Sequence, residues 1–345
     1  MALFKSFGEN PSGPRQETIL RSSHFRDGVF QNISETVLMA KNGSLARNFW
    51  KFVNKPANTK PPSELPSVKT DLKNLGGKEP VIIWFGHSSY FIHCQGKNIL
   101  VDPVLSGYAS PFSFGPKSFK GSDIYRPEDF PEIDILLLTH DHYDHLDNRT
   151  LLALKPKIKQ VCASLGVGSH LVYWGFDEKI IQEADWWQTR VFPGDIELTA
   201  APARHFSGRS LTRNRTLWSS FILQVPGYRF YLGGDSGYDL HFEQIGEHFG
   251  SFDIAILECG QYNEQWPQIH MMPEETVQAC IDLKAAVLFP VHWSKFSLAL
   301  HPWNEPIERL LARAGQVQVK VTTPMIGEPV ILNRSYPRSD WWAGV

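Results

Sequence analysis

The densest group of potential metal ligands lies in the segment Thr139-His140-Asp141-His142-Tyr143-Asp144-His145. His140, His142 and His145 bring three imidazoles, and Asp144 brings a carboxylate, all within a few residues. Imidazole nitrogen and carboxylate oxygen are suitable ligands for zinc and similar divalent metals. Because one short turn cannot complete the coordination of two ions, a metal site here needs further ligands from distant parts of the chain.

Three distant residues can supply those ligands, and each follows a strand-like apolar run: His205, Asp235 and His292. Gly233 and Gly234 precede Asp235 and allow the backbone to approach a ligand closely. A single histidine after a strand is more often structural than a ligand. Ligand-type residues at four separate strand ends make coincidence improbable, so we interpret them as one metal site.

Such a site needs a scaffold that gathers strand ends, and from Pro80 onward the sequence has the pattern of one. The early strand-like runs follow one another through short turns, whereas later runs are separated by helical stretches. This order favours a layered α/β fold with mixed sheets over a doubly wound parallel sheet. The expected strands are 81–85, 90–92, 98–101, 133–138, 220–225, 229–232, 254–257 and 286–289, and expected helices are 149–154 and 273–283.

Further motifs narrow the likeness to a known family. The segment from Thr139 to His145 matches the His-x-His-x-Asp-His signature of the metallo-β-lactamase superfamily. Other segments resemble N-acyl-phosphatidylethanolamine-hydrolysing phospholipase D and its bacterial relatives, over roughly residues 75–335. They are Trp84-Phe-Gly-His-Ser-Ser-Tyr90, Asp102-Pro-Val-Leu-Ser-Gly-Tyr108, Gly115-Pro-Lys-Ser-Phe119, Asp185-Trp-Trp187, Gly234-Asp-Ser-Gly-Tyr238 and His292-Trp-Ser-Lys-Phe296. The resemblance implies an αβ/βα four-layer sandwich, in which two mixed β-sheets are flanked by helices.

The resemblance also implies how the ligands divide between two metal ions. One ion would take His140, His142 and His205, and the second would take Asp144, His145 and His292, with Asp235 bridging both. The implied cofactor is two Zn²⁺, with Mn²⁺ or Fe²⁺ as alternatives, and the implied catalytic carboxylates are Asp144 and Asp235. A hydroxide shared by the metals would attack phosphorus. Whether Asp144 also handles protons is left open.

Four more residues are candidates for supporting roles. His270 matches a histidine that the resemblance places on the substrate phosphate. His87, in a Gly-His-Ser-Ser turn, is expected to support a ligand from behind. Asp102 and Asp147 can hold ligand imidazoles through the second ring nitrogen, and ordinary turn capping is the alternative for each.

The sequence therefore predicts a dinuclear phosphodiesterase of the phospholipase D type, acting on an N-acyl-phosphatidylethanolamine-like lipid. Phosphatidate and an N-acylethanolamine would be the products. The alternative is a metal-dependent hydrolase of a soluble phosphodiester or a sugar-phosphate lactone. An aromatic groove for lipid chains, formed by Trp186, Trp187, Trp218, Trp266, Trp293 and Phe296, is weighed against ordinary core packing.

Composition limits the partners and the location. The 345 residues contain 34 Lys and Arg against 36 Asp and Glu, and no basic block indicates a nucleic-acid partner. Residues 1–11 have no apolar core of a signal peptide, so a cytoplasmic location is expected, with peripheral contact at the inner membrane face left open. Four scattered cysteines predict buried thiols. The sequence leaves the oligomeric state undetermined.

Three regions are expected along the chain. Residues 1–75 form an N-terminal extension with a proline-rich connector, in which 44–53 is expected as a short helix. Residues 76–335 form the metallo-β-lactamase-fold hydrolase domain, and 336–345 form a C-terminal tail. For the extension, a strap packed over the domain is favoured over a lid or interfacial role.

Overall fold

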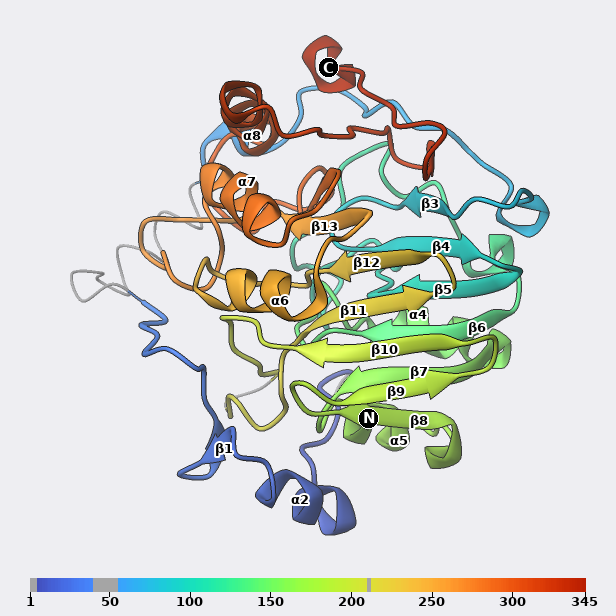
Figure 1. Ribbon diagram of the computed structural model, residues 1–345, viewed down its shortest axis with the longest axis vertical. Coiled ribbons are helices and arrows are strands. Elements are labelled where there is room, and N and C mark those ends of the chain that lie inside the picture. The colour runs from blue at the N-terminus through green and yellow to red at the C-terminus, as the bar shows by residue number, and fades with distance from the viewer. Residues whose placement is uncertain (1–4, 40–54, 210–211) are drawn as a thin grey trace.

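The computed structural model describes residues 5–39, 55–209 and 212–345, and it is built on two stacked mixed sheets (Figure 1). The first sheet has seven strands and the second has six. In spatial order the first consists of β15 (Pro329–Ile331), β3 (Val81–Trp84), β4 (Tyr90–Cys94), β5 (Lys97–Val101), β6 (Ile133–Leu138), β7 (Ile158–Ser164) and β8 (Ile181–Ala184). The second consists of β14 (Leu288–Val291), β13 (Ile254–Glu258), β12 (Tyr228–Leu232), β11 (Ser220–Val225), β10 (Ile196–Ala201) and β9 (Thr189–Phe192).

Both sheets mix parallel and antiparallel pairs. Strands β5 to β8 are parallel, while β15, β3, β4 and β5 pair antiparallel. In the second sheet β12, β13 and β14 are parallel, and β9 to β12 are antiparallel. The predicted mixed two-sheet architecture is confirmed.

Helices cover the outer faces of the sheets and complete the four layers (Figure 1). The first sheet packs against α4 (Asn148–Leu154) and α5 (Gly168–Tyr173), and the second against α6 (His241–Phe249), α7 (Pro273–Asp282) and α8 (Glu305–Val317). Short 3-10 turns are η1 (Ala57–Thr59), η2 (Leu72–Asn74), η3 (Pro127–Asp129), η4 (Lys155–Lys157), η5 (Glu178–Ile180) and η6 (Trp341–Gly344).

The near-continuous apolar sequence of β6 follows from burial on both faces. Ile135 and Leu137 belong to the large core cluster that joins the two sheets. Leu136 and Leu138 belong to the cluster beneath α4 and α5. Because successive side chains of a strand point to opposite faces, a strand in the middle of a layered fold needs apolar residues at every position. The polar segment that begins at Thr139 therefore marks where the strand leaves the core.

The N-terminal segment packs along the domain as a strap. It forms α2 (Gly13–Leu20) and the two-residue strands β1 (Phe25–Arg26) and β2 (Val29–Phe30). Ile19 and Phe30 are fully buried in a third apolar cluster with Trp186, Leu217 and Trp218. The helix expected at 44–53 lies outside the described residues.

The C-terminal turn η6 also packs against the domain. In η6, Trp341 and Trp342 pack on Trp293 with ring centroids 5.3 and 5.6 Å away. All four cysteines are free and buried, as predicted. Among the described helices, none has the length and apolar character needed to cross a bilayer.

Candidate metal centre

Four strand ends of the two sheets converge and carry the predicted ligands into one place. His140, His142, Asp144 and His145 follow β6, and the other three ligands follow strands of the second sheet. His205 comes after β10, Asp235 after β12 and His292 directly after β14. All seven fall within two groups whose ligand atoms lie within 4.8 Å of one another in each group.

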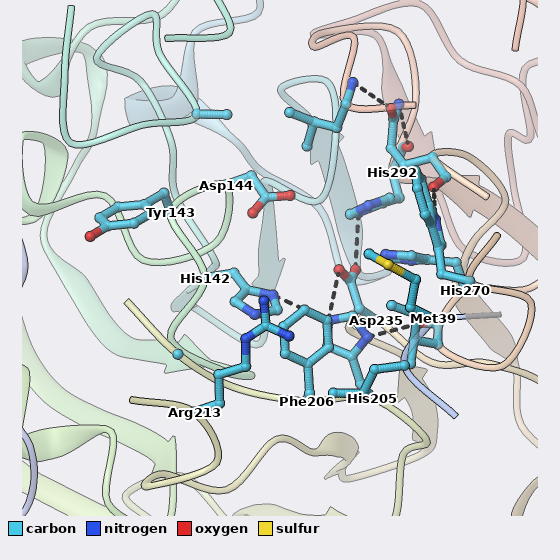
Figure 2. A pocket seen from close by; sticks show the side chains of 17 residues that line it. Met39, His142, Tyr143, Asp144, His205, Phe206, Arg213, Asp235, His270 and His292 are labelled. Carbon is cyan, nitrogen blue, oxygen red and sulfur yellow. Dashed lines mark hydrogen bonds and ion pairs between the residues drawn. The ribbon is translucent and has the colours of Figure 1, made fainter. Parts of the chain in front are cut away.

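The first group contains His140, His142, His205 and Asp235. Figure 2 shows the last three of these residues. His142 Nδ1 lies 3.0 Å from His140 Nε2 and 3.2 Å from His205 Nε2. Asp235 Oδ2 lies 3.8 Å from His140 Nε2 and 3.7 Å from His205 Nε2. These are the residues that the resemblance implied for one metal, together with the implied bridge.

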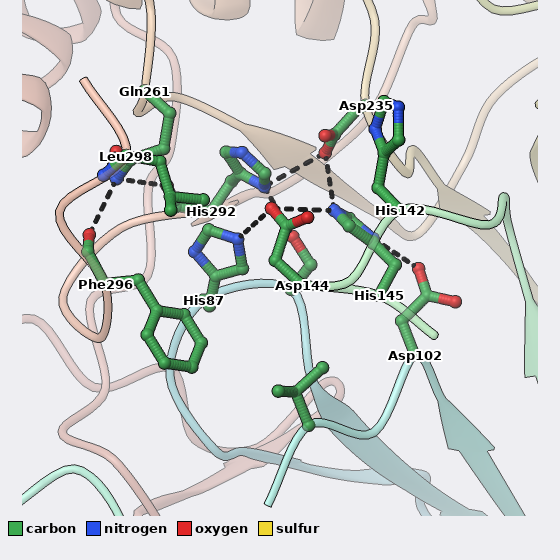
Figure 3. A network of polar contacts seen from close by, with 12 residues as sticks. His87, Asp102, His142, Asp144, His145, Asp235, Gln261, His292, Phe296 and Leu298 are labelled. Atoms are coloured by element: carbon green, nitrogen blue, oxygen red, sulfur yellow. Dashed lines mark hydrogen bonds and ion pairs between the residues drawn. The ribbon is translucent and has the colours of Figure 1, made fainter. Parts of the chain in front are cut away.

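The second group contains His87, Asp144, His145 and His292 (Figure 3). Asp235 turns its other oxygen to this side, with Oδ1 3.2 Å from His145 Nε2 and 3.0 Å from His292 Nδ1. Asp235 thus presents one carboxylate oxygen to each group. This is the arrangement that a bridging ligand requires.

The buried donor atoms have the chemistry of a cation site. His145 Nε2 and Asp235 Oδ1 are buried 3.2 Å apart, and among the described residues neither atom makes a hydrogen bond of acceptable geometry, which is unusual for polar atoms inside a protein. Burial lowers the pKa of His292 to about 3 and holds the pKa of His205 well below its usual range. Neutral imidazoles offer lone pairs to a metal, so the residues present fit a pair of divalent ions.

The carboxylates of the site also favour positive charge. Burial lowers the pKa of His145, but Asp235 and Asp144 outweigh burial and hold that pKa well above its usual range. Burial raises the pKa of Asp235, and the neighbouring His145 and His292 reverse this and keep it well below its usual range. Ionised carboxylates at this position would equally stabilise a bound cation.

Partners behind the ligands fix the orientation of the rings. Asp102 Oδ2 lies 2.8 Å from His145 Nδ1, and the same carboxylate accepts hydrogen bonds from Thr139 N and Oγ1 at 2.9 and 2.6 Å. His205 Nδ1 donates to the Ile269 carbonyl at 2.8 Å. Each contact leaves Nε2 of the ring for the site. Asp102 therefore lies behind a candidate ligand imidazole, which is one of the two interpretations that the sequence left open for it.

His87 also lies next to the site. Its ring is buried, Nε2 is 2.9 Å from Asp144 Oδ2, and the ring centroid is 4.0 Å from that of His292. The contact with Asp144 is that of a residue supporting a ligand, although His87 also belongs to the second donor group.

For Asp147, the structure shows turn capping and not the support of a ligand imidazole. Its Oδ1 accepts from Arg149 N at 3.1 Å, and its Oδ2 accepts from Thr150 Oγ1 and Ser106 N at 2.5 and 3.2 Å. Asp147 thus caps the first turn of α4 and joins it to a neighbouring loop. Its carboxylate oxygens are engaged there and hold no ligand imidazole.

Glu258 is a site residue that the sequence interpretation missed. It ends β13, is fully buried, and its Oε2 lies 2.6 Å from His270 Nδ1 while Oε1 accepts from Ser236 N at 2.8 Å. Burial raises the pKa of Glu258 to about 7, and for His270 the nearby Glu258 overcomes burial and raises the pKa to about 9. The available signal was its position at the end of an apolar run, a position that it shares with the candidate ligands.

Asp141, inside the signature, is a second missed residue. Its carboxylate accepts from Gly208 N at 2.7 Å and lies 3.2 Å from His170 Nε2. The buried Arg209 donates to the Asp141 and Leu146 carbonyls, both at 2.7 Å. These contacts tie the loop that carries four ligands to its neighbours.

The donor groups border a cavity of about 440 Å³ (Figure 2). Of the six aromatic residues considered for a groove, Trp266 alone lines this cavity. Trp218, Trp293 and Phe296 are each 1% exposed, so they belong to the core. The large apolar side chains that line the cavity are Leu38, Met39, Phe206, Trp266, Ile269 and Leu298. The other lining residues are Ala109, His142, Tyr143, Asp144, His205, Gly208, Arg213, Asp235, Gln261, His270 and His292.

The fold and the donor set together define a metallo-hydrolase of the metallo-β-lactamase superfamily. The sequence profile of the beta-lactamase superfamily domain matches residues 97–293, and the chain belongs to this superfamily. An uncharacterised protein of Mycobacterium tuberculosis is 38% identical over 93% of this chain and 88% of its own length.

Relatives with a functional name include two phospholipases D. N-acyl-phosphatidylethanolamine-hydrolyzing phospholipase D 1 of Caenorhabditis elegans is 30% identical over 71% of this chain and 74% of its own length. The mitochondrial enzyme of that name from Saccharomyces cerevisiae is 35% identical over 74% of this chain and 57% of its own length. The resemblance found in the sequence motifs is therefore confirmed.

Solved structures agree in fold. A metallo hydrolase of Ignicoccus hospitalis aligns with a TM-score of 0.56 at 21% identity, over 74% of this chain and 99% of its own. A diiron β-hydroxylase of Streptomyces venezuelae aligns with a TM-score of 0.55 at 19% identity, over 74% of this chain and 55% of its own.

Proposed function

We propose that this protein is a dinuclear zinc phosphodiesterase of the phospholipase D type, which hydrolyses an N-acyl-phosphatidylethanolamine or a related phospholipid. The observation that carries the proposal is Asp235, whose two oxygens face two separate donor groups beside one cavity. The names of the worm and yeast relatives support the choice of substrate. Water would add to phosphorus, the bond from phosphorus to the headgroup oxygen would break, and that oxygen would take a proton, giving phosphatidate and an N-acylethanolamine.

Each side chain has a distinct task in this proposal. A pair of divalent ions activates water and neutralises charge at a phosphodiester under attack. His140, His142, His205, Asp144, His145, His292 and Asp235 would hold the pair. Asp144 is kept in place through its Oδ2 by His87. His270 uses Nδ1 on Glu258, which leaves Nε2 for a phosphate oxygen in the cavity.

The apolar part of the cavity suits an acyl chain. Leu38 and Met39 come from the N-terminal segment, and Phe206, Ile269 and Leu298 come from loops of the domain. A soluble phosphodiester or a sugar-phosphate lactone would make little use of this surface. The apolar lining is therefore the reason to prefer a lipid substrate.

Product analysis tests the proposal. Purified protein, with its metal content measured by plasma mass spectrometry, is incubated with N-acyl-phosphatidylethanolamine in mixed micelles, and the products are identified by mass spectrometry. We expect two metals per chain and release of N-acylethanolamine, with Asp235→Asn at least about 100-fold less active. Asp195→Asn, in an exposed turn, is the matched control. Cleavage of small phosphodiesters or lactones without any gain from micelles would contradict the lipid assignment, and iron instead of zinc would overturn the metal assignment.

We also propose that the rim of the cavity contacts a phospholipid surface. Phe114 is 83% exposed and Met39 40% exposed, and both lie in segments whose residues line the cavity. Exposed apolar side chains in segments that also line a cavity are suited to an interface with lipid. In vesicle co-sedimentation we expect Phe114→Asp to reduce binding. Leu20→Asp, at a 63% exposed position on α2, should bind as the wild type does, and equal binding of all three proteins would reject the contact.

A further inference from the structure

Arg213 is a cation on the wall of the cavity beside the metal donors. Its guanidinium carbon lies 5.3 Å from the centroid of the Phe206 ring. That ring is in turn 4.5 Å from the ring of His142 and 4.9 Å from that of His205, measured between centroids. Figure 2 shows the Arg213 side chain rising toward His142. The charge therefore lies next to the first donor group.

The guanidinium of Arg213 is used differently from those of the other arginines in the same loop. Arg209 is buried and donates to three backbone carbonyls, and Arg215 donates to the Gly28 carbonyl at 3.0 Å. For Arg213, the cation–π contact with Phe206 is the one ring contact of the guanidinium among residues 5–39, 55–209 and 212–345. Its N–H groups make no ion pair or hydrogen bond with that part of the chain.

Stacking on an aromatic ring leaves a guanidinium ready to bind an anion. The guanidinium carbon lies over the Phe206 ring, and the N–H groups remain available to an anion. These N–H groups match the two oxygens of a phosphate or carboxylate, which they bind through paired, charge-assisted hydrogen bonds. A lysine at this position would keep the charge but lose the contact of the guanidinium with the ring and its paired N–H donors.

We propose that Arg213 binds an anionic oxygen of the substrate, so that anionic substrates are favoured over neutral ones. The inference rests on the proposed function for the identity of the substrate. The oxygen belongs either to the scissile phosphate or to an anionic group on the alcohol it carries. Both sources present the same oxyanion to the guanidinium.

Substitutions of Arg213 separate the effects of its charge, its paired N–H donors and its packing on Phe206. Arg213→Met keeps an unbranched stem on Phe206, Arg213→Lys keeps the charge, and Arg215→Met removes a charge from the same loop outside the cavity. Two readouts are used: binding of dihexyl phosphate by titration calorimetry, and kinetics on bis(4-nitrophenyl) phosphate and on N-acylphosphatidylserine, which adds a headgroup carboxylate. Because Arg213 is exposed, both of its variants should melt as the wild type does.

We expect Arg213→Met to weaken dihexyl phosphate binding and to raise KM by about 10- to 100-fold with kcat little changed, as loss of a charge-assisted pair predicts. Arg213→Lys should recover part of this, and Arg215→Met should match the wild type. A loss on both substrates assigns the scissile phosphate, and a loss on N-acylphosphatidylserine alone assigns the headgroup. Unchanged binding and KM in Arg213→Met would overturn the inference. Absence of hydrolysis in the wild type, with binding that still depends on Arg213, would reject the proposed function alone.

Discussion

At the scale of single residues, the histidines of the metal centre depend on what contacts the ring nitrogen that faces away from the site. His145 has Asp102 at Nδ1, and His205 has the Ile269 carbonyl. An imidazole has two nitrogens, and a partner that accepts a hydrogen bond at one of them leaves the other as the lone-pair donor. The site is thus determined by these partners as much as by the ligands.

Asp102 allows this dependence to be measured. In Asp102→Asn, the side chain no longer supplies a charged acceptor to both His145 and Thr139, so Nε2 of His145 is no longer fixed as the donor. We expect metal affinity or activity to fall by about 10- to 100-fold. Chelator competition measures the affinity. Asp147→Ala, which removes the cap of α4, should instead lower the free energy of unfolding by about 0.5–2 kcal/mol and leave metal affinity intact. Equal metal affinity in Asp102→Asn and wild type would contradict this role.

At the scale of elements, the strand ends could be predicted, but some of the residues that support the ligands could not. Residues 135–138, which precede Thr139 and His140, are all apolar, so the end of the strand is visible in the sequence. Glu258 ends an equally apolar run. The sequence does not indicate whether a glutamate at such a position faces solvent or a buried histidine. Strands β8 and β9 escaped prediction because their residues are largely exposed or half-buried and carry charges, which weakens the apolar pattern.

The C-terminal turn η6 braces the loop that carries His292. Trp342 is 4% exposed and packs on Trp293, whose carbonyl accepts from His87 N at 2.9 Å. Trp342→Ala removes a large buried ring, so we expect the free energy of unfolding to fall by about 3–5 kcal/mol in urea titrations. Trp187→Ala, at a 40% exposed position, should cost much less. Similar losses for the two variants would show that η6 does not brace this loop.

Helix α6 contains a histidine, His241, that makes the free energy of unfolding depend on pH. Burial lowers the pKa of His241 to about 3, from an ordinary value of 6.5. Between these two pH values the unfolded chain binds a proton that the folded chain does not. Stability therefore falls as pH decreases through this range, with a slope of about 1.4 kcal/mol per pH unit from this residue.

Replacing the imidazole tests this account. In His241→Gln the slope of unfolding free energy against pH between pH 6 and 4 should be smaller than in the wild type. Urea titrations at several pH values give the slope. His248→Gln, at an exposed position of the same helix, controls for the loss of a histidine. An unchanged slope in His241→Gln would refute the assignment.

At the scale of the whole molecule, the N-terminal segment is part of the metal centre and not an appendage. Its composition and prolines predicted an extension, and no local pattern indicated where it would lie. Asn32 accepts hydrogen bonds through Oδ1 from His205 N and Trp218 Nε1, both at 3.1 Å, and donates through Nδ2 to the His205 carbonyl at 2.8 Å. The segment therefore clamps the backbone of a ligand, a contact made 173 residues away along the chain.

The contacts of Asn32 with His205 can be tested by substitution. Asn32→Ala removes three hydrogen bonds and leaves buried backbone groups of His205 unpaired, so we expect about 1–3 kcal/mol less stability and weaker metal binding. Asn10→Ala, on the same segment, removes an exposed contact with Thr212 and should change neither. Urea titration measures the first quantity and chelator competition the second. A variant at Asn32 that loses stability while keeping full metal affinity would mean that the strap stabilises the domain without positioning His205.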